Sequence, residues 1–517
     1  MKLKKVIITM LLSMCAFLCT AQGFVIVEGK TKHELNPQIT SYSSDAQLLT
    51  GLYEGLFSYN PLTLEPDYAI ASEYHVSRDK KRWTITLRKD AKFSNGEPIT
   101  AAHVRDSFIK LLATPGAPYA SMLDIIWGAG DFRNKKCSES EVGISVIDDY
   151  TLAVRLVSPA NYLPKVLCHA SFSVVHSDSA VYSGPYVLSE QTENTYVLKK
   201  NPFYWDAENV KLEEITFLQS EDEKENAYLF NTGKADWITN NVDAEALINK
   251  SSLQIGGEFG TAYYFFKLSN KNPYKEGKFN PWDYSEFRNA ILEAIPWKEL
   301  RANVAVPALN FVYPLTGYNS PDGFDYTDVA EAKMMMDTAR RKYGILDDEV
   351  LTLTFEISQF TLTEEKKDLL KAALLPLGVE LVITEIPSYF YLSNVPYSSA
   401  DMFAYTWIGD FADPLAFLEL FRSNSSLNDS GWSDPQFDSL LERAASGTAY
   451  QRYEDLAQAE KILLDSGMVI PIYHPVSYNI INLNETGGWA MNAFDVHPLK
   501  YLYKKEVHTS AANVVMR

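Results

Sequence analysis

An α/β fold with at least two lobes is what the sequence predicts, on three observations. The chain has 517 residues, and a domain typically takes ~100–200, so several domains are expected. Short stretches with the alternating pattern of β-strands are interspersed with stretches that have the helical spacing of apolar residues. In the second half, a strand, a helix and a second strand follow one another, an order that implies parallel pairing.

The first clear module lies between residues 52 and 112. A strand buried on one face is indicated by the alternation of apolar with polar residues at Trp83, Ile85 and Leu87. Turn residues follow at 94–96, and Thr100 can cap a helix. The apolar stripe of that helix would consist of Val104, Phe108, Leu111 and Leu112. A second strand pattern follows at Leu152, Val154 and Leu156.

The second half alternates helices and strands. A helix is predicted from about Asp328 to Tyr343, because Gly344 is a good residue to end it. A strand at 351–355, a helix at 363–375 and a strand at 379–386 form the parallel unit. Asp434-Pro435 begins another helix, whose apolar face would consist of Phe437, Leu440, Leu441 and Ala444.

The N-terminus has the features of an export signal. Three lysines precede an apolar run at residues 6–18, which is too short for a bilayer core of ~30 Å. Cys19-Thr20-Ala21 is a plausible cleavage site, with Gln22 as the first mature residue. We therefore predict a signal peptide at 1–21, with a buried N-terminal helix as the alternative. No later stretch approaches 18 apolar residues, so a soluble mature protein is expected.

The four cysteines leave two questions open. Cys15 and Cys19 lie in the signal, and lipid modification of either would anchor the protein to a membrane. Bulky residues precede both, where lipid-attachment motifs prefer small ones. Cys137 and Cys168 remain in the mature chain, where they would form either one disulfide or two buried free thiols.

Charge and aromatic content narrow the functional class. The chain carries 47 Lys and Arg against 66 Asp and Glu, a net charge of −19 that becomes −22 without the three signal lysines. Nucleic-acid binding needs concentrated positive charge and is therefore not expected. The 31 Tyr, 26 Phe and 9 Trp exceed the needs of a plain core and suit pockets for a partly apolar ligand.

Signatures of catalysis are missing from the sequence. It contains no G-x-S-x-G, H-E-x-x-H or G-x-x-x-x-G-K-[ST] motif. The nearest pair of histidines, His169 and His176, lacks the spacing of a zinc site. We therefore expect no enzymatic activity, no cofactor and no metal.

One local segment, Trp407–Pro414, suggests binding chemistry. The alternation before it predicts a strand, so Asp410 would lie at a strand's carboxyl end between Trp407 and Phe411. A carboxylate partly desolvated by two rings would attract a ligand cation such as an α-ammonium. Alternatively Asp410 only holds a turn. Asp413-Pro414 has the pattern of an N-cap and first helical residue.

Seven motifs occur in a characteristic order along nearly the whole mature chain. They are LNP at 35–37, LYEGLF at 52–57, RWTITLRKDAKFSNGEPITAAHV at 82–104, SGPY at 183–186, NPFYW at 201–205, WIGDFADP at 407–414 and AEKILLDSGMVIPIY at 459–473. In these motifs the chain resembles the extracellular solute-binding proteins of peptide ABC transporters, the oligopeptide- and dipeptide-binding group.

The resemblance implies a periplasmic-binding-protein architecture of type II, with two lobes, a hinge and an extra subdomain. Lobe I would comprise residues 22–53, 173–261 and 479–517, the extra subdomain 54–172 and lobe II 262–478. Such a protein captures short peptides between its lobes outside the cytoplasm, in the periplasm. It delivers them to the permease and ATPase of an inner-membrane ABC importer, and it is expected to be a monomer.

The resemblance also assigns ligand-binding residues. Asp410 matches the aspartate that pairs with the peptide's α-ammonium, Trp407 the tryptophan beside it, and Tyr119 a tyrosine facing the cleft. The segments expected to pair with the peptide backbone consist of Ser41, Tyr42 and Ser43, and of Tyr405, Thr406 and Trp407. Asn240 and Asn241 match a loop near the ligand.

Two positions depart from the pattern. Some oligopeptide binders have an arginine, available to a ligand carboxylate, where this chain has Ala404, and an acidic residue where it has Ser41. The partner of the ligand's carboxylate is therefore unassigned. Relatives also carry nickel chelates, haem or oligosaccharides, so a sugar, metal chelate or haem is the first alternative cargo. A secreted hydrolase, and an adhesin or sensory module, are further alternatives.

Overall fold

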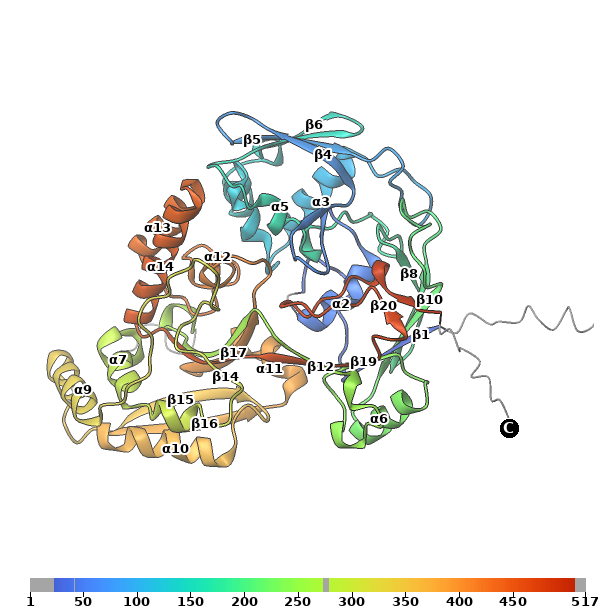
Figure 1. Ribbon diagram of the computed structural model, residues 1–517. Coiled ribbons are helices and arrows are strands. Elements are labelled where there is room, and N and C mark those ends of the chain that lie inside the picture. The colour runs from blue at the N-terminus through green and yellow to red at the C-terminus, as the bar shows by residue number, and fades with distance from the viewer. Residues whose placement is uncertain (1–22, 41, 273–278, 507–517) are drawn as a thin grey trace, which may run out of the picture.

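The computed structural model describes residues 23–40, 42–272 and 279–506 (Figure 1). Over these residues the chain forms three sheets of four or more strands, each covered by helices, so the predicted α/β class and the division into lobes are confirmed. The predicted signal at 1–21, with Cys15 and Cys19, lies outside the described residues. No helix within the described ranges is long and apolar enough to cross a membrane.

Lobe I is built on a seven-stranded sheet with the order β12-β19-β11-β1-β10-β9-β8. Its strands are β1 (Phe24–Glu28), β8 (Tyr186–Gln191), β9 (Thr195–Lys200), β10 (Glu214–Gln219), β11 (Trp237–Thr239), β12 (Leu253–Gly257) and β19 (Val476–Ile481). Strand β1 pairs in parallel with β10 and β11, while the other pairs are antiparallel. Helices α2 (Ser43–Leu52) and α6 (Glu223–Asn231) pack on this sheet.

Lobe II is built on a six-stranded sheet with the order β14-β18-β13-β17-β15-β16. Its strands are β13 (Gly260–Phe266), β14 (Val306–Pro307), β15 (Leu351–Ser358), β16 (Val379–Ile386), β17 (Met402–Ile408) and β18 (Val469–His474). Strands β15 and β16 pair in parallel and are connected by a segment that contains α10 (Glu364–Leu374), as the sequence predicts. The other helices of this lobe are α7 (Ser285–Ala294), α8 (Trp297–Leu300), α9 (Val329–Tyr343), α11 (Ser388–Asn394), α12 (Leu415–Leu418), α13 (Pro435–Ser446) and α14 (Ala449–Asp465).

The part of the chain predicted to form the subdomain, residues 54–172, contains an antiparallel four-stranded sheet at the top of Figure 1. Its elements are β4 (Ala71–Val76), β5 (Arg82–Leu87), β6 (Ile144–Asp148), β7 (Thr151–Arg155), α3 (Ala101–Ala113), α4 (Ala129–Arg133) and α5 (Leu163–Val166). The predicted alternation in β5 is confirmed, with Trp83, Ile85 and Leu87 buried. Small two-stranded sheets pair β2 (Phe57–Tyr59) with β3 (Pro66–Tyr68), and β20 (Thr486–Gly487) with β21 (Tyr503–Lys504).

The predicted helix ends agree with the structure, with one exception. Asp328 caps α9 through hydrogen bonds from two backbone amides, and Gly344 ends it with a φ of 72°. The exception is Pro414, which precedes the first helical residue of α12 instead of being that residue. The carboxylate of Asp413 accepts the Leu415 amide at 2.9 Å, which is the bond expected of a residue that caps this helix, and Pro414 already has a helical φ of −55° and ψ of −29°.

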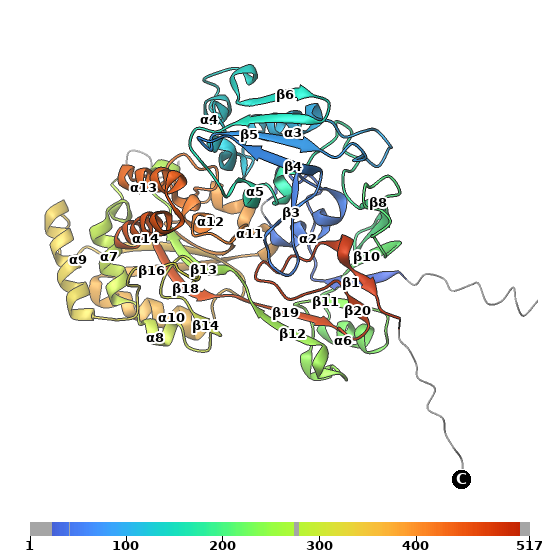
Figure 2. The ribbon, with the colours of Figure 1, turned by 45° about the horizontal axis from the view of Figure 1, so that its top comes forward.

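The chain crosses between the two large sheets at two neighbouring places. One crossing joins β12 to β13 and the other joins β18 to β19, and the Glu258 amide donates to the Pro475 carbonyl between them (Figure 2). The strands of each large sheet come from the residues predicted for that lobe, with two small differences. Strand β13 of lobe II begins at Gly260, before the predicted limit at 262, and strand β19 of lobe I begins at Val476, before the predicted limit at 479. The exact limits of the predicted parts remain predictions.

The two mature cysteines are free thiols in the structure. Cys137 lies by the Gly128 carbonyl and Cys168 by the Pro164 carbonyl, each half-buried. The disulfide alternative is therefore not what the structure contains.

Candidate functional site

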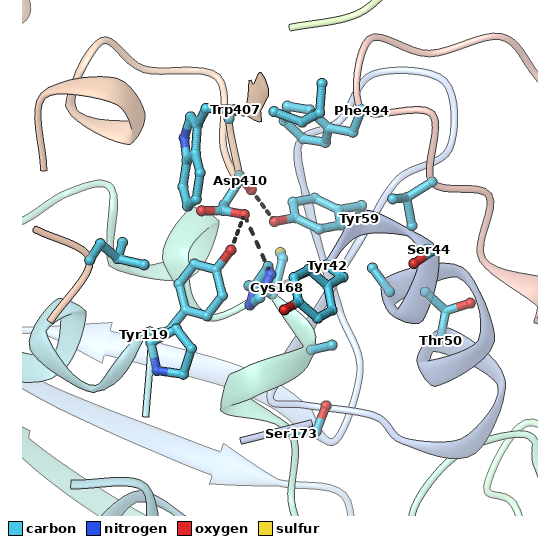
Figure 3. A pocket seen from close by; sticks show the side chains of 18 of the residues that line it. Tyr42, Ser44, Thr50, Tyr59, Tyr119, Cys168, Ser173, Trp407, Asp410 and Phe494 are labelled. Atoms are coloured by element: carbon cyan, nitrogen blue, oxygen red, sulfur yellow. Dashed lines mark hydrogen bonds and ion pairs between the residues drawn. The ribbon is translucent and has the colours of Figure 1, made fainter. Parts of the chain in front are cut away.

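A cavity of about 890 Å³ lies where the two lobes and the subdomain meet (Figure 3). Lobe I contributes to its wall Tyr42, Ser44, Thr50 and Lys500. The subdomain contributes Tyr59, Tyr119, Cys168 and His169. Lobe II contributes Tyr405, Thr406, Trp407, Asp410 and Asp429. The structure thus brings together six of the ten residues that the sequence predicts to bind the ligand.

Asp410 follows the carboxyl end of β17, as predicted, and is held from the subdomain. The Tyr119 hydroxyl donates to its Oδ1 at 3.1 Å, and His169 Nε2 lies 3.4 Å from the same oxygen. The Tyr59 hydroxyl donates to the backbone carbonyl of Asp410. Only 12% of the Asp410 side chain is exposed. The carboxylate therefore lies at the contact between lobe II and the subdomain (Figure 3).

Asp410 has no cationic partner in the described part of the chain. Burial raises its pKa to about 7, although the Tyr119 hydrogen bond opposes that rise. Burial also lowers the pKa of His169 to about 4, so this imidazole is neutral at physiological pH. A ligand ammonium at this position would supply the missing charge and stabilise the ionised carboxylate.

Trp407 closes one side of this position. Its indole Nε1 donates to the Ala416 carbonyl at 2.8 Å, which fixes the ring beside Asp410 (Figure 3). The centroid of this ring lies 6.4 Å from that of Tyr119. Two aromatic side chains thus flank the carboxylate and reduce its contact with water.

Strand β17 presents a partly open edge beside the cavity. Its pairing with β15 ends at Phe403, although β13 pairs with it as far as Ile408. The Tyr391 hydroxyl bonds to both the amide and the carbonyl of Ala404, at 2.9 and 3.0 Å, in place of a strand. Thr406 lies two residues further along, so its backbone groups point to the same edge. An extended ligand could pair there as an added strand.

The lobe I segment lies on the other side of the cavity. Tyr42 lines the cavity with 42% of the residue exposed, and Ser43 is the first residue of α2. Ser41 lies outside the described residues, so its predicted contact stays a prediction.

A buried histidine supports this segment from behind. His33 bonds to Asp45 at 2.9 Å and to Glu28 at 2.6 Å. Burial alone would lower the pKa of His33, but these two carboxylates outweigh it and raise the pKa to about 9. The ion pairs of the charged ring thus tie α2 to β1.

Asn240 and Asn241 lie apart from the residues that line the cavity. Asn240 has a φ of 59°, and its side-chain oxygen accepts the Tyr478 amide at 3.0 Å. The Asn241 side chain donates to the Ser220 carbonyl at 2.6 Å. Both amides hold loops of lobe I, and their predicted contact with a ligand stays a prediction.

Several cavity residues were not predicted from the sequence. Lys500 donates to Glu54 at 2.8 Å and to Ser58 at 3.1 Å, forming a buried ion pair in the wall. Tyr204 and Trp205 donate to the same Glu54 carboxylate, each at 2.6 Å. Glu54 lies in the LYEGLF motif and could have been suspected, whereas no local pattern marks Lys500, Tyr59 or Asp429.

The sequence of this chain is similar to a known protein family and to individual proteins. A family model described as bacterial extracellular solute-binding proteins, family 5 middle, matches residues 65–429. The dipeptide-binding protein DppE of Bacillus subtilis is 26% identical, over 90% of this chain and 88% of DppE. The periplasmic oligopeptide-binding protein OppA of Escherichia coli is also 26% identical, over 95% of this chain and 93% of OppA.

Solved structures share the fold. Listeria monocytogenes OppA bound to peptide matches with a TM-score of 0.78 at 23% identity, over 94% of this chain and all of that one. The Escherichia coli murein tripeptide binding protein MppA matches with a TM-score of 0.80 at 24% identity, over 94% and 99%. A structure of MppA described as the unliganded open form reaches only 0.63, at 23% identity over 94% and 98%. The predicted two-lobed binding-protein architecture is confirmed.

Proposed function

Because this chain belongs to the bacterial extracellular solute-binding proteins of family 5, we propose that it captures short peptides between its lobes and delivers them to an ABC importer. The observation that carries the proposal is the Asp410 carboxylate, only 12% exposed and without a cationic partner among the described residues, beside the open edge of β17. The first group suits an α-ammonium and the second suits a peptide backbone. Relatives named for dipeptide and oligopeptide binding support the same cargo.

The cavity is suited to a peptide in size and in lining. Its volume of about 890 Å³ falls within the ~300–1,000 Å³ of small-molecule sites. In the proposed arrangement the ligand's amino terminus meets Asp410 and Trp407, and its backbone runs along Tyr405 and Thr406. Tyr119 and the 41–43 segment would cover it from the other side. Backbone recognition accepts many sequences, because main-chain groups recur in every peptide.

The cargo can be tested directly on the purified protein. We expect mass spectrometry to detect a mixture of short peptides after the protein, purified without added ligand, is denatured and filtered. A parallel preparation of Asp410→Asn should release less peptide per mole, because the ammonium contact is lost. Release of sugars, haem or a metal chelate instead, or of nothing, would overturn the proposal.

The remaining proposals concern location and assembly. We propose export through a signal at residues 1–21, with the mature chain outside the cytoplasm as a monomer without enzymatic activity. Lipid attachment at Cys15 or Cys19 remains the alternative to simple cleavage after Ala21. The intact mass of the protein from the cell envelope separates these outcomes, since an acylated cysteine adds the mass of its lipid.

A further inference from the structure

A second carboxylate, that of Asp429, lines the same cavity on the lobe II side. The Tyr405 hydroxyl donates to its Oδ2 at 2.9 Å and so fixes its orientation. Over the described residues, Oδ1 accepts no hydrogen bond, and the residue is half-buried. One oxygen is therefore held by Tyr405, while the other has no hydrogen-bond partner among the described residues.

Asp429 forms no ion pair within the described part of the chain. Lys267 and Lys271 act on it from a distance, but neither forms an ion pair with it, and burial still raises the pKa of this carboxyl. The Lys267 ammonium donates instead to the carbonyls of the 395–398 segment, at 2.8 to 3.1 Å.

The other charged groups of the cavity are either paired with an opposite charge or exposed on its lobe I side. Glu54 is neutralised by Lys500 at 2.8 Å, so it adds no unmatched charge. Lys30 and Lys32 are exposed and lie on the lobe I loop after β1. The lobe II wall therefore holds two carboxylates, Asp410 and Asp429, that form no ion pair with Lys or Arg of the described residues, in a cavity that would bind a single ligand.

The spacing of these two carboxylates follows β17. Tyr405, which holds Asp429, precedes Asp410 by five positions, a separation of at most about 16 Å along an extended chain. A ligand with its amino terminus at Asp410 and its backbone along this edge would bring the side chain of its second, third or fourth residue near Asp429. A lysine or arginine side chain at one of these positions is long enough for its charged group to reach the Asp429 carboxylate.

We propose that Asp429, positioned by Tyr405, forms a second anionic subsite that selects peptides with a lysine or arginine among residues two to four. This inference rests on the proposed function and specifies its substrate class. A charge-assisted contact with a partly desolvated carboxylate discriminates well, because a neutral side chain leaves the half-buried carboxylate without an ion-pair partner.

The test compares matched tetrapeptides by isothermal titration calorimetry at pH 7.5. Each has an alanine background and carries lysine, norleucine or glutamate at position two, three or four. For the native protein, we expect lysine to bind at least about tenfold tighter than norleucine at one position or more, and glutamate correspondingly weaker. In Asp429→Asn the ratio of lysine to norleucine affinity should fall to about one.

The matched control is Asp368→Asn, which removes an exposed carboxylate from α10 outside the cavity and should keep the native ratio. A ratio near one in the native protein would overturn this inference, as would an unchanged ratio in Asp429→Asn. The glutamate peptides test the subsite on the native protein alone, whether or not the variant folds. If no tetrapeptide binds at all, the proposed function itself is wrong.

Discussion

Replacing Asp410 by asparagine is expected to weaken the binding of peptides with a free amino terminus by roughly 10- to 100-fold. The carboxylate lies in a cavity wall, only 12% exposed, and no cation of the described chain pairs with it. Its negative charge is thus available to an α-ammonium. N-acetylated versions of the same peptides should lose little affinity on this substitution, because they bring no positive charge to this position. Isothermal titration calorimetry with both series measures the difference.

Asparagine removes the negative charge of Asp410 while keeping the shape of its side chain. Its side-chain oxygen can still accept the Tyr119 hydroxyl, and the bond from Tyr59 to the backbone carbonyl is unaffected. Asp368→Asn again serves as the control for loss of a carboxylate elsewhere. If free and acetylated peptides lose affinity equally, Asp410 only holds the turn and does not bind the ammonium.

The same contact predicts a pH dependence of binding. The pKa of Asp410 is about 7 in the unliganded protein, so below pH 7 the carboxyl is largely neutral and the ionic contact is lost. Affinity for free peptides should therefore rise between about pH 6 and 7.5. It should fall again as the peptide's α-amino group loses its proton, near pH 8. Asp410→Asn should remove the acid limb of this profile.

The free energy of unfolding of the unliganded protein should depend on pH in the opposite direction to peptide affinity. A carboxyl whose pKa rises from 3.8 to about 7 on folding binds more protons in the folded state over that range. Its contribution to the free energy of unfolding therefore decreases as the pH rises through the same range. Bound peptide should offset this loss, since a ligand that binds only the folded state stabilises it.

Replacing Lys500 by methionine is expected to lower the free energy of unfolding by about 3–5 kcal/mol. Lys500 and Glu54 have only 9% and 4% of their side chains exposed, at an Nζ–Oε1 distance of 2.8 Å. Without the lysine, the Glu54 carboxylate would keep, among the described residues, the hydrogen bonds from Tyr204 and Trp205 to compensate its buried charge. Urea denaturation at neutral pH measures the loss.

Two further variants separate the ion pair from packing. The double variant Glu54→Gln/Lys500→Met removes both charges and should recover at least half of the lost stability. Lys461→Met breaks the exposed pair with Asp465, whose side chains are 63% and 62% exposed, and should cost less than about 1 kcal/mol. A double variant as unstable as Lys500→Met would show that the cost lies in packing.

Local sequence patterns predicted individual elements well. The alternation at Trp83, Ile85 and Leu87 predicted β5, because a strand buried on one face needs that period. Asp328 and Gly344 predicted the ends of α9, because capping depends on neighbouring residues alone. At α12 the pattern predicted the start to within one position, because Pro414 already has a helical φ of −55° and ψ of −29° and the Asp413 carboxylate accepts the Leu415 amide.

The sequence by itself determined the α/β class, the family motifs and the place of Asp410 at the end of a strand, since these depend on local order along the chain. Only the tertiary structure decided what surrounds that carboxylate. Tyr59 and Asp410 are 351 positions apart, and Lys500 and Glu54 are 446 apart. Such pairs form when lobes and subdomain pack together, and the desolvation that raises the pKa of Asp410 arises from that packing.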